Sequence, residues 1–151
     1  MNESDLRELY QEVIMSHNKY PHNRRCLENC THDAQGDNPL CGDQVHIYVN
    51  INNSVVENVT FEGEGCAISV ASASILTKLL KGKSRAMCEK LSNYFQKICT
   101  RDAIESIKEN EEFSNLDIEE LNLLSSVKHF PARVKCATLA WHTFDHAVKE
   151  K

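Results

Sequence analysis

The alternation of apolar and polar residues predicts a short antiparallel sheet in the first half of the chain. Residues 44–51 alternate strictly, and one face carries Val45, Ile47, Val49 and Ile51. Such a period of two is typical of a strand with one buried face. Asn52 and Asn53 suit a tight turn, after which residues 55–62 return as the second strand of a hairpin. The stretch 22–39 is polar and irregular with weak strand signals, so we interpret it as mostly loop.

Helical periodicity predicts one helix before this hairpin in the sequence and several helices after it. Apolar residues recur every three or four positions in residues 2–17, 66–80, 84–98, 117–127 and 131–148. Ser84 is a suitable N-cap, and Asp117 with Glu120 resembles a capping box. The pattern therefore predicts an α+β fold, with a small antiparallel sheet and helices, in one domain spanning residues 1–151.

Composition and charge narrow the possible partners. The chain has 17 basic and 22 acidic residues and a net charge of −5, so we expect no nucleic-acid partner. No apolar run is long enough to span a bilayer, so we expect no membrane partner. Residues 1–10 contain charged side chains where a signal peptide is apolar, which indicates a cytoplasmic protein. In a reducing compartment, the seven cysteines favour metal binding or thiol chemistry over disulfides.

Three cysteines occur where regular elements are expected to begin or end. Cys41 lies in a Pro/Gly turn before the first strand, Cys66 lies between hairpin and helix, and Cys136 lies early in the last helix. Asp43 points to the same side as Cys41 if the stretch is extended. Three thiolates and one carboxylate are enough for a tetrahedral Zn²⁺ site. Their wide sequence separation leaves open that the cysteines are free, partly buried thiols.

Two basic residues stand next to the third cysteine. A site of three thiolates and Asp43 stays negatively charged after Zn²⁺ binds, so nearby cations would stabilise it. Arg133 shares a helical face with Cys136, and Lys135 is adjacent in sequence. We expect both to balance the charge of the site or to contact a partner.

Three sequence strings closely resemble the SufU branch of the IscU/NifU N-terminal family. They are Asn-Pro-Leu-Cys-Gly-Asp at 38–43, Phe-Glu-Gly-Glu-Gly-Cys-Ala-Ile-Ser at 61–69, and Phe-Pro-Ala-Arg-Val-Lys-Cys-Ala-Thr-Leu at 130–139. The resemblance implies an IscU-like fold of about three antiparallel strands covered on one face by helices. It also implies zinc ligands, namely Cys41, Asp43, Cys66 and Cys136. Cys41 matches the residue that accepts persulfide sulfur from a SufS-type cysteine desulfurase.

Departures from the IscU branch favour sulfur relay over cluster assembly. Lys135 stands where IscU-type scaffolds have a histidine, and their Leu-Pro-Pro-Val-Lys motif is absent. The alternative remains a scaffold that assembles a labile [2Fe–2S] cluster on the same ligands, with iron in place of zinc, and passes it to apo-proteins. A structural zinc module that only binds a partner is a third possibility.

The remaining candidate ligands are interpreted as structural. Cys26 and Cys30 form a C-x₃-C pair in the polar stretch, where we expect exposed loop residues rather than a second metal site. Packing roles are expected for Cys88 and Cys99, a satisfied core-edge position for His17, and a solvated outer strand face for His46 and Tyr48.

Overall fold

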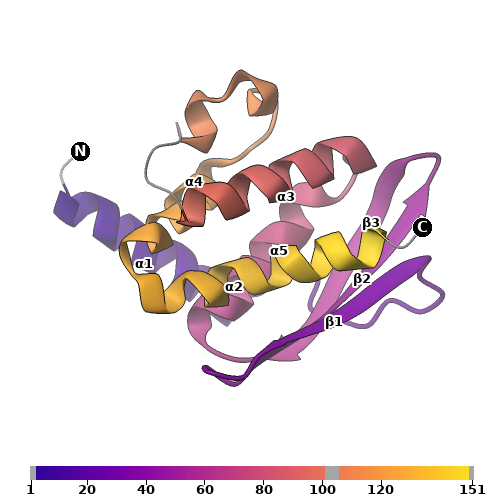
Figure 1. Cartoon of the computed structure of the whole chain (residues 1–151), viewed down its shortest axis with the longest axis horizontal. Coiled ribbons are helices and arrows are strands. Elements are labelled where there is room, and N and C mark those ends of the chain that lie inside the picture. The colour runs from indigo at the N-terminus through magenta and orange to yellow at the C-terminus, as the bar shows by residue number, and fades with distance from the viewer. Residues whose placement is uncertain (1–2, 101–105, 150–151) are drawn as a thin grey trace.

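The computed structural model describes residues 3–100 and 106–149 and contains a three-stranded antiparallel sheet with helices on one side (Figure 1). The strands are β1 (His32–Asn38), β2 (Asp43–Asn52) and β3 (Val55–Glu64), in the order β1-β2-β3. The helices are α1 (Glu3–Lys19), α2 (Ala67–Leu80), α3 (Arg85–Thr100), α4 (Glu119–Leu124) and α5 (Val134–Lys149). Short 3₁₀ turns are η1 (Ile107–Glu109), η2 (Glu111–Phe113), η3 (Ser125–His129) and η4 (Pro131–Arg133). The predicted α+β class is confirmed.

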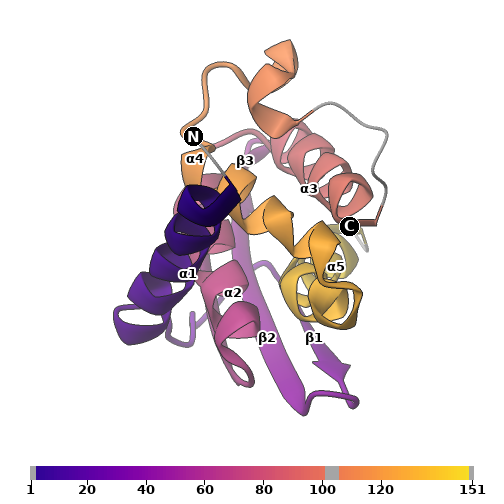
Figure 2. The same ribbon diagram turned by 90° about the vertical axis from the view of Figure 1, so that its left-hand side faces the viewer.

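The core lies between the inner face of the sheet and the helices α2 and α5. The alternation predicted for β2 holds, since Val45, Ile47 and Val49 are buried. Helix α1 covers α2, and α3 packs on α5 (Figure 2). The fully buried Trp141 of α5 donates through Nε1 to Ser72 Oγ of α2 at 3.0 Å. This bond and the apolar packing around it fix α2 against α5, and the start of each helix carries a candidate cysteine.

The expectation of a loop throughout residues 22–39 is wrong for residues 32–38, which form β1. Ala34 and Gly36 pair with Ile47 and Val45 of β2 and face the helices. A Cβ atom added to Gly36 would lie 2.2 Å from Thr143 Oγ1 of α5. Because α5 packs so closely on this edge strand, its inner positions are small, and no large apolar residue alternates along it.

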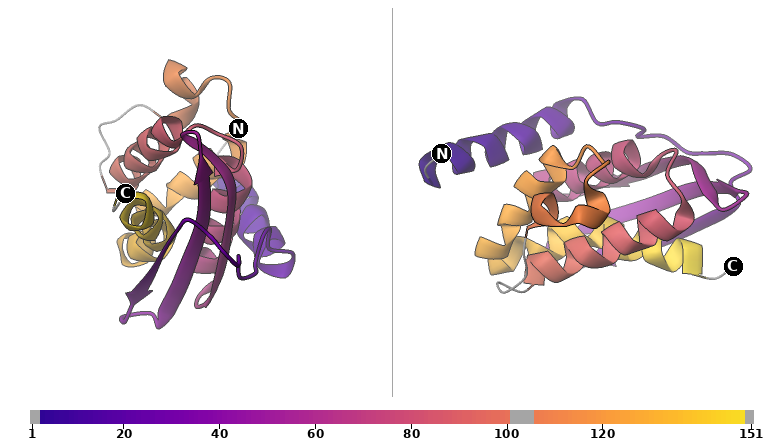
Figure 3. Two further views of the ribbon diagram at one scale, coloured as in Figure 1. Left: turned by 90° about the vertical axis from the view of Figure 1, so that its right-hand side faces the viewer. Right: turned by 90° about the horizontal axis from the view of Figure 1, so that it is seen from above.

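The chain segment before β1 covers part of the outer face of the sheet. Residues 22–31 pass from the β3 edge, where Arg24 bridges to Phe61, across to β1 (Figure 3, left). Tyr48 is consequently only 8% exposed, and its hydroxyl donates to Glu62 Oε1 at 2.5 Å. The ring of His46 stacks on it with centroids 4.0 Å apart. The outer face around Tyr48 is therefore covered, which corrects the expectation of a solvated face.

The predicted capping box at Asp117 and Glu120 is also wrong. Helix α4 begins at Glu119 with Ile118 as its N-cap, and the Ile118 side chain makes no cap hydrogen bond. The Glu120 carboxylate instead accepts a hydrogen bond from His17 across to α1. The carboxylate of Glu120 thus bonds to a residue distant in sequence instead of to the N-terminus of its own helix.

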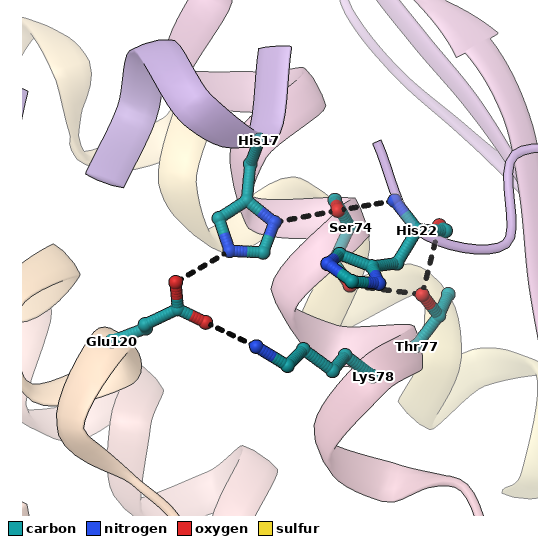
Figure 4. Close-up of polar contacts among 6 residues, drawn as sticks. All are labelled: His17, His22, Ser74, Thr77, Lys78 and Glu120. Atoms are coloured by element: carbon teal, nitrogen blue, oxygen red, sulfur yellow. Dashed lines mark hydrogen bonds and ion pairs between the residues drawn. The ribbon is translucent and has the colours of Figure 1, made fainter. Parts of the chain in front are cut away.

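His17 joins three helices through a buried polar network (Figure 4). It is 2% exposed, with Nδ1 2.7 Å from Ser74 Oγ and Nε2 2.9 Å from Glu120 Oε2. Lys78 donates to the other carboxylate oxygen at 3.0 Å. Although burial raises the pKa of Glu120, the hydrogen bonds from His17 and Lys78 hold it below its ordinary value. The interpretation of His17 as a satisfied side chain is confirmed.

No helix in the two described segments is both long and apolar enough to cross a membrane.

Candidate metal centre

Cys41, Asp43 and Cys136 converge at one end of the sheet. One ligand atom from each lies within 4.8 Å of the other two. The sulfur atoms of Cys41 and Cys136 are 3.5 Å apart, although the residues are 95 positions apart in sequence. The structure thus brings together three of the four ligands that the family resemblance implies.

The β1–β2 turn positions Cys41 and Asp43. Asn38 and Asp43 close the hairpin as a strand pair, and the Cys41 N–H donates to the Asn38 carbonyl at 3.2 Å. Gly42, between the two candidate ligands, has a φ of +71°, which a glycine adopts without strain. The turn therefore leaves Cys41 half-buried, while Asp43 at the start of β2 is fully buried.

Asn38 is a site residue that the sequence analysis missed. Its buried amide Nδ2 lies 3.4 Å from Asp43 Oδ2 and 3.9 Å from Cys136 Sγ, and donates to both. It therefore orients two candidate ligands from different elements. Its presence in the string at 38–43 was the available signal, but a role in the site required the tertiary structure.

Cys66 lies at the edge of the group, as the N-cap of α2. Its backbone N–H donates to Asp43 Oδ1 at 2.8 Å. Gly65 allows this approach, because a Cβ atom there would lie only 2.3 Å from Asp43 Oδ1. The Cys66 thiol is among the groups that raise the pKa of Cys136, but it does not belong to the set mutually within 4.8 Å.

The surroundings of Cys136 disfavour its thiolate form. Burial, and then hydrogen bonds to Cys41, Cys66 and Asp43, raise the pKa of Cys136 well above that of an ordinary thiol. A positive charge among these groups would stabilise the thiolates instead.

Arg133 is a protein cation that interacts with the cysteines of the site. A hydrogen bond with Cys136, followed by the charges of Cys136, Cys66 and Cys41, raises the pKa of Arg133. Lys135 is exposed, and Arg133 rather than Lys135 is the cation that contacts Cys136.

The donor set fits zinc. Zn²⁺ binds thiolates at about 2.3 Å, so two thiolates in a tetrahedral site lie about 3.8 Å apart. The 3.5 Å separation of the Cys41 and Cys136 sulfurs is close to this value. Asp43 adds a buried carboxylate oxygen, and Cys66 is the nearby thiol that would complete four ligands. Thiolates also hold iron–sulfur clusters, so the donor set is compatible with both groups.

The other cysteines lie elsewhere. Cys88 and Cys99 are buried in α3, and burial raises the pKa of each to about 12, which supports the packing role expected for them. Cys26 is exposed and Cys30 half-buried in the segment before β1.

The sequence profile of the NifU-like N-terminal domain matches residues 9–150. The chain belongs to this family. It is 35% identical over 148 residues to "Zinc-dependent sulfurtransferase SufU" of Bacillus subtilis (strain 168), covering 98% of this chain and 95% of that protein. It is 34% identical over 146 residues to "Iron-sulfur cluster assembly scaffold protein IscU" of Streptococcus pyogenes serotype M1, covering 97% and 86%.

Solved structures agree with this family. FiSufU of Fervidobacterium islandicum AW-1 superposes with a TM-score of 0.77 at 27% identity, covering 93% of this chain and 96% of that one. A NifU-like N-terminal domain from Brucella abortus gives a TM-score of 0.79 at 16% identity, covering 94% and 93%, and shows the shared fold alone. The fold and the family expected from the three strings are confirmed.

Proposed function

We propose that this chain is a zinc-dependent sulfur acceptor in iron–sulfur cluster biogenesis. It takes persulfide sulfur from a SufS-type cysteine desulfurase and stimulates that enzyme. The observation that carries the proposal is the meeting of Cys41, Asp43 and Cys136 within 4.8 Å, on a surface that leaves Cys41 half-buried. The relative named as a zinc-dependent sulfurtransferase, which matches nearly the whole chain, supports it.

Exposure favours Cys41 over Cys136 as the acceptor, while Cys66 is half-buried like Cys41. Cys136 is fully buried, whereas Cys41 lies on the β1–β2 turn next to Leu40, which is 82% exposed. A docked protein therefore reaches Cys41 without moving a helix. Cys66, Cys136 and Asp43 then remain in place to hold the zinc.

Sulfur transfer to Cys41 is a thiol–disulfide-type exchange. The Cys41 thiolate attacks the terminal sulfur of the desulfurase persulfide, and a new S–S bond forms as the old one breaks. The desulfurase cysteine leaves as a thiolate, so no external oxidant or reductant is needed. Zinc held by Cys41, Asp43, Cys66 and Cys136 would supply the positive charge that favours thiolates near neutral pH.

The protein's own groups prepare this chemistry. Asn38 and the Cys66 N–H each donate a hydrogen bond to a different oxygen of Asp43 and so orient its carboxylate. Arg133 places a guanidinium beside the cysteines and offsets negative charge as they ionise. Lys135, exposed one residue before Cys136, is proposed to contact the desulfurase.

Metal analysis and a desulfurase rate assay test the proposal. The protein as purified should contain about one zinc per chain, as expected of a closed four-ligand site. Cys41→Ala should abolish stimulation of the desulfurase and keep the circular dichroism spectrum of the wild type. Cys26→Ala, which removes an exposed thiol outside the site, should stimulate fully. Full stimulation by Cys41→Ala would contradict the proposal.

The second candidate function is a scaffold for a labile [2Fe–2S] cluster. It is favoured by the shared thiolate donors and by the relative named as an IscU scaffold protein. Anaerobic reconstitution separates the two functions. A stoichiometric cluster that reaches an apo-protein faster than free iron and sulfide would reverse the preference. A structural zinc module would instead require Cys41→Ser to retain full sulfur transfer.

We further propose that the chain acts in the cytoplasm and passes its sulfur to an assembly scaffold or to apo-proteins. Reducing conditions there would keep the seven free thiols reduced.

A further inference from the structure

A groove lies between α1 on one side and η3 with the following Phe130 on the other. It has a volume of about 310 Å³ and is lined by Leu6, Arg7, Tyr10, Ser126, His129 and Phe130. Leu6 lies in the helix predicted from the apolar repeat of residues 2–17, yet it is 43% exposed, and Phe130 is 40% exposed. Two large apolar side chains thus remain open to solvent on facing walls of one groove.

The groove adjoins the candidate metal centre. The rings of Tyr10 and Phe130 stack with centroids 6.0 Å apart. Burial, and then the nearby Cys66, Cys99 and Cys136, raise the pKa of Tyr10 to about 12. The Phe130 carbonyl accepts from the Arg133 N–H at 2.7 Å. A ligand in the groove would therefore lie next to Phe130 and near Arg133, which interacts with Cys136.

Two arginines, Arg7 and Arg133, lie in or near the groove although the chain as a whole carries −5. Arg7 and His129 line it, and Arg133, which is hydrogen-bonded to the Phe130 carbonyl, interacts with Cys136. Within residues 3–100 and 106–149, none of these three side chains is paired with a carboxylate. The acidic residues of α1, such as Glu8 and Glu12, do not line the groove.

We propose that this groove binds a segment of the cysteine desulfurase that carries a large apolar side chain flanked by Asp or Glu. The identity of the partner, a cysteine desulfurase, rests on the proposed function. The kind of segment that binds is inferred from the residues that line the groove. The apolar walls accept the large side chain, and the guanidinium groups of Arg7 and Arg133 pair with the carboxylates. Docking there would hold the desulfurase near Arg133 and the candidate metal centre, where Cys41 is half-buried.

Two groove variants and one matched control test this site by titrating the chain against a fixed amount of desulfurase. Arg7→Glu reverses a charge in the groove, and Phe130→Ser removes an apolar wall. Lys81→Glu reverses an exposed charge at the opposite end of α2 from Cys66. Each groove variant should raise the concentration for half-maximal stimulation about tenfold and leave the maximal rate unchanged. Lys81→Glu should behave as the wild type.

Isothermal titration calorimetry of the same variants with the desulfurase measures their affinity directly, without relying on the rate of the desulfurase. Dissociation constants of both groove variants within about twofold of the wild-type value would overturn the proposal. If Cys41→Ala stimulates fully while the groove variants bind weakly, the proposed function fails and the groove assignment stands. Arg7 is exposed, so Arg7→Glu remains informative if Phe130→Ser lowers the stability of the fold.

Discussion

The backbone N–H of Cys66 donates a 2.8 Å hydrogen bond to Oδ1 of Asp43. This bond ties the first residue of β2 to the N-cap of α2, and Gly65 lies directly against the same carboxylate. The position of Asp43 in the metal centre therefore depends on a glycine that contributes no ligand itself.

Gly65→Ala should weaken zinc binding by about tenfold or more, the usual cost of disturbing a group that orients a metal ligand. The added Cβ would lie 2.3 Å from Asp43 Oδ1, so the carboxylate must move. Competition with a zinc-binding dye measures the change. Gly82→Ala is the matched control, because Gly82 also has a positive φ (+85°) but open space around it. It should lower the melting temperature and leave zinc affinity unchanged; equal zinc affinities for all three proteins would refute the dependence on Gly65.

Removal of zinc should change the reactivity of a defined set of thiols. Iodoacetamide at pH 8 should modify Cys41 and Cys66 rapidly only after a chelator has removed the metal, because zinc-bound thiolates are protected. Cys88 and Cys99 should stay unmodified in both states, since they are buried and their pKa values are raised to about 12. Cys26, exposed outside the site, should react equally in both. Peptide mass spectrometry reads each site, and metal-independent labelling of Cys41 would argue against its being a ligand.

Alkaline pH should destabilise the fold through its buried thiols. Burial raises the pKa of Cys99 in the folded state to about 12, while a thiol in the unfolded chain titrates near about 8.5. The unfolded state therefore binds fewer protons between these values, and stability falls as pH rises through this window. The melting temperature should decrease accordingly. Cys99→Ala should be less stable at pH 7 but show a shallower decrease, whereas a slope as steep as the wild type's would exclude this thiol as a cause.

The His17 network should contribute more to stability than its surface ion pair. His17→Ala leaves the Ser74 hydroxyl and the Glu120 carboxylate without their buried partner, and should cost about 1–3 kcal/mol of unfolding free energy. Lys78→Ala removes only a contact from a side chain that is 46% exposed, and should cost less than about 1 kcal/mol. Urea denaturation compares the two variants. Equal losses would show that burial of His17 adds nothing to the network.

Local patterns in the sequence predicted most of the elements. Strict alternation predicted β2, and three- and four-residue spacing predicted the helix at 131–148, in which Trp141 and Phe144 are buried. Both signals arise because one face of an element is buried over its whole length. The three strings around Cys41, Cys66 and Cys136 also indicated the family, and the family implied the fold.

Where a neighbouring element decides the environment, local patterns failed. The inner face of β1 holds Gly36 because α5 packs too closely for a larger residue. The sequence of β1 therefore lacks the alternation of large apolar and polar residues that would predict a strand. Tyr48 lies on the outer face by its position in β2 but is covered by residues 22–31. Glu120 has the spacing of a capping box, yet its carboxylate contacts His17, 103 residues away.

By itself, the sequence determined which residues could bind metal and which faces of the main elements are buried, because chemical type and periodicity are local properties. Only the tertiary structure decided that Cys41 and Cys136 lie 3.5 Å apart, that Asn38 orients both Asp43 and Cys136, and that Leu6 and Phe130 face one open groove. These relationships depend on how α1, α2 and α5 pack against each other and the sheet, and packing joins residues that no spacing along the chain connects.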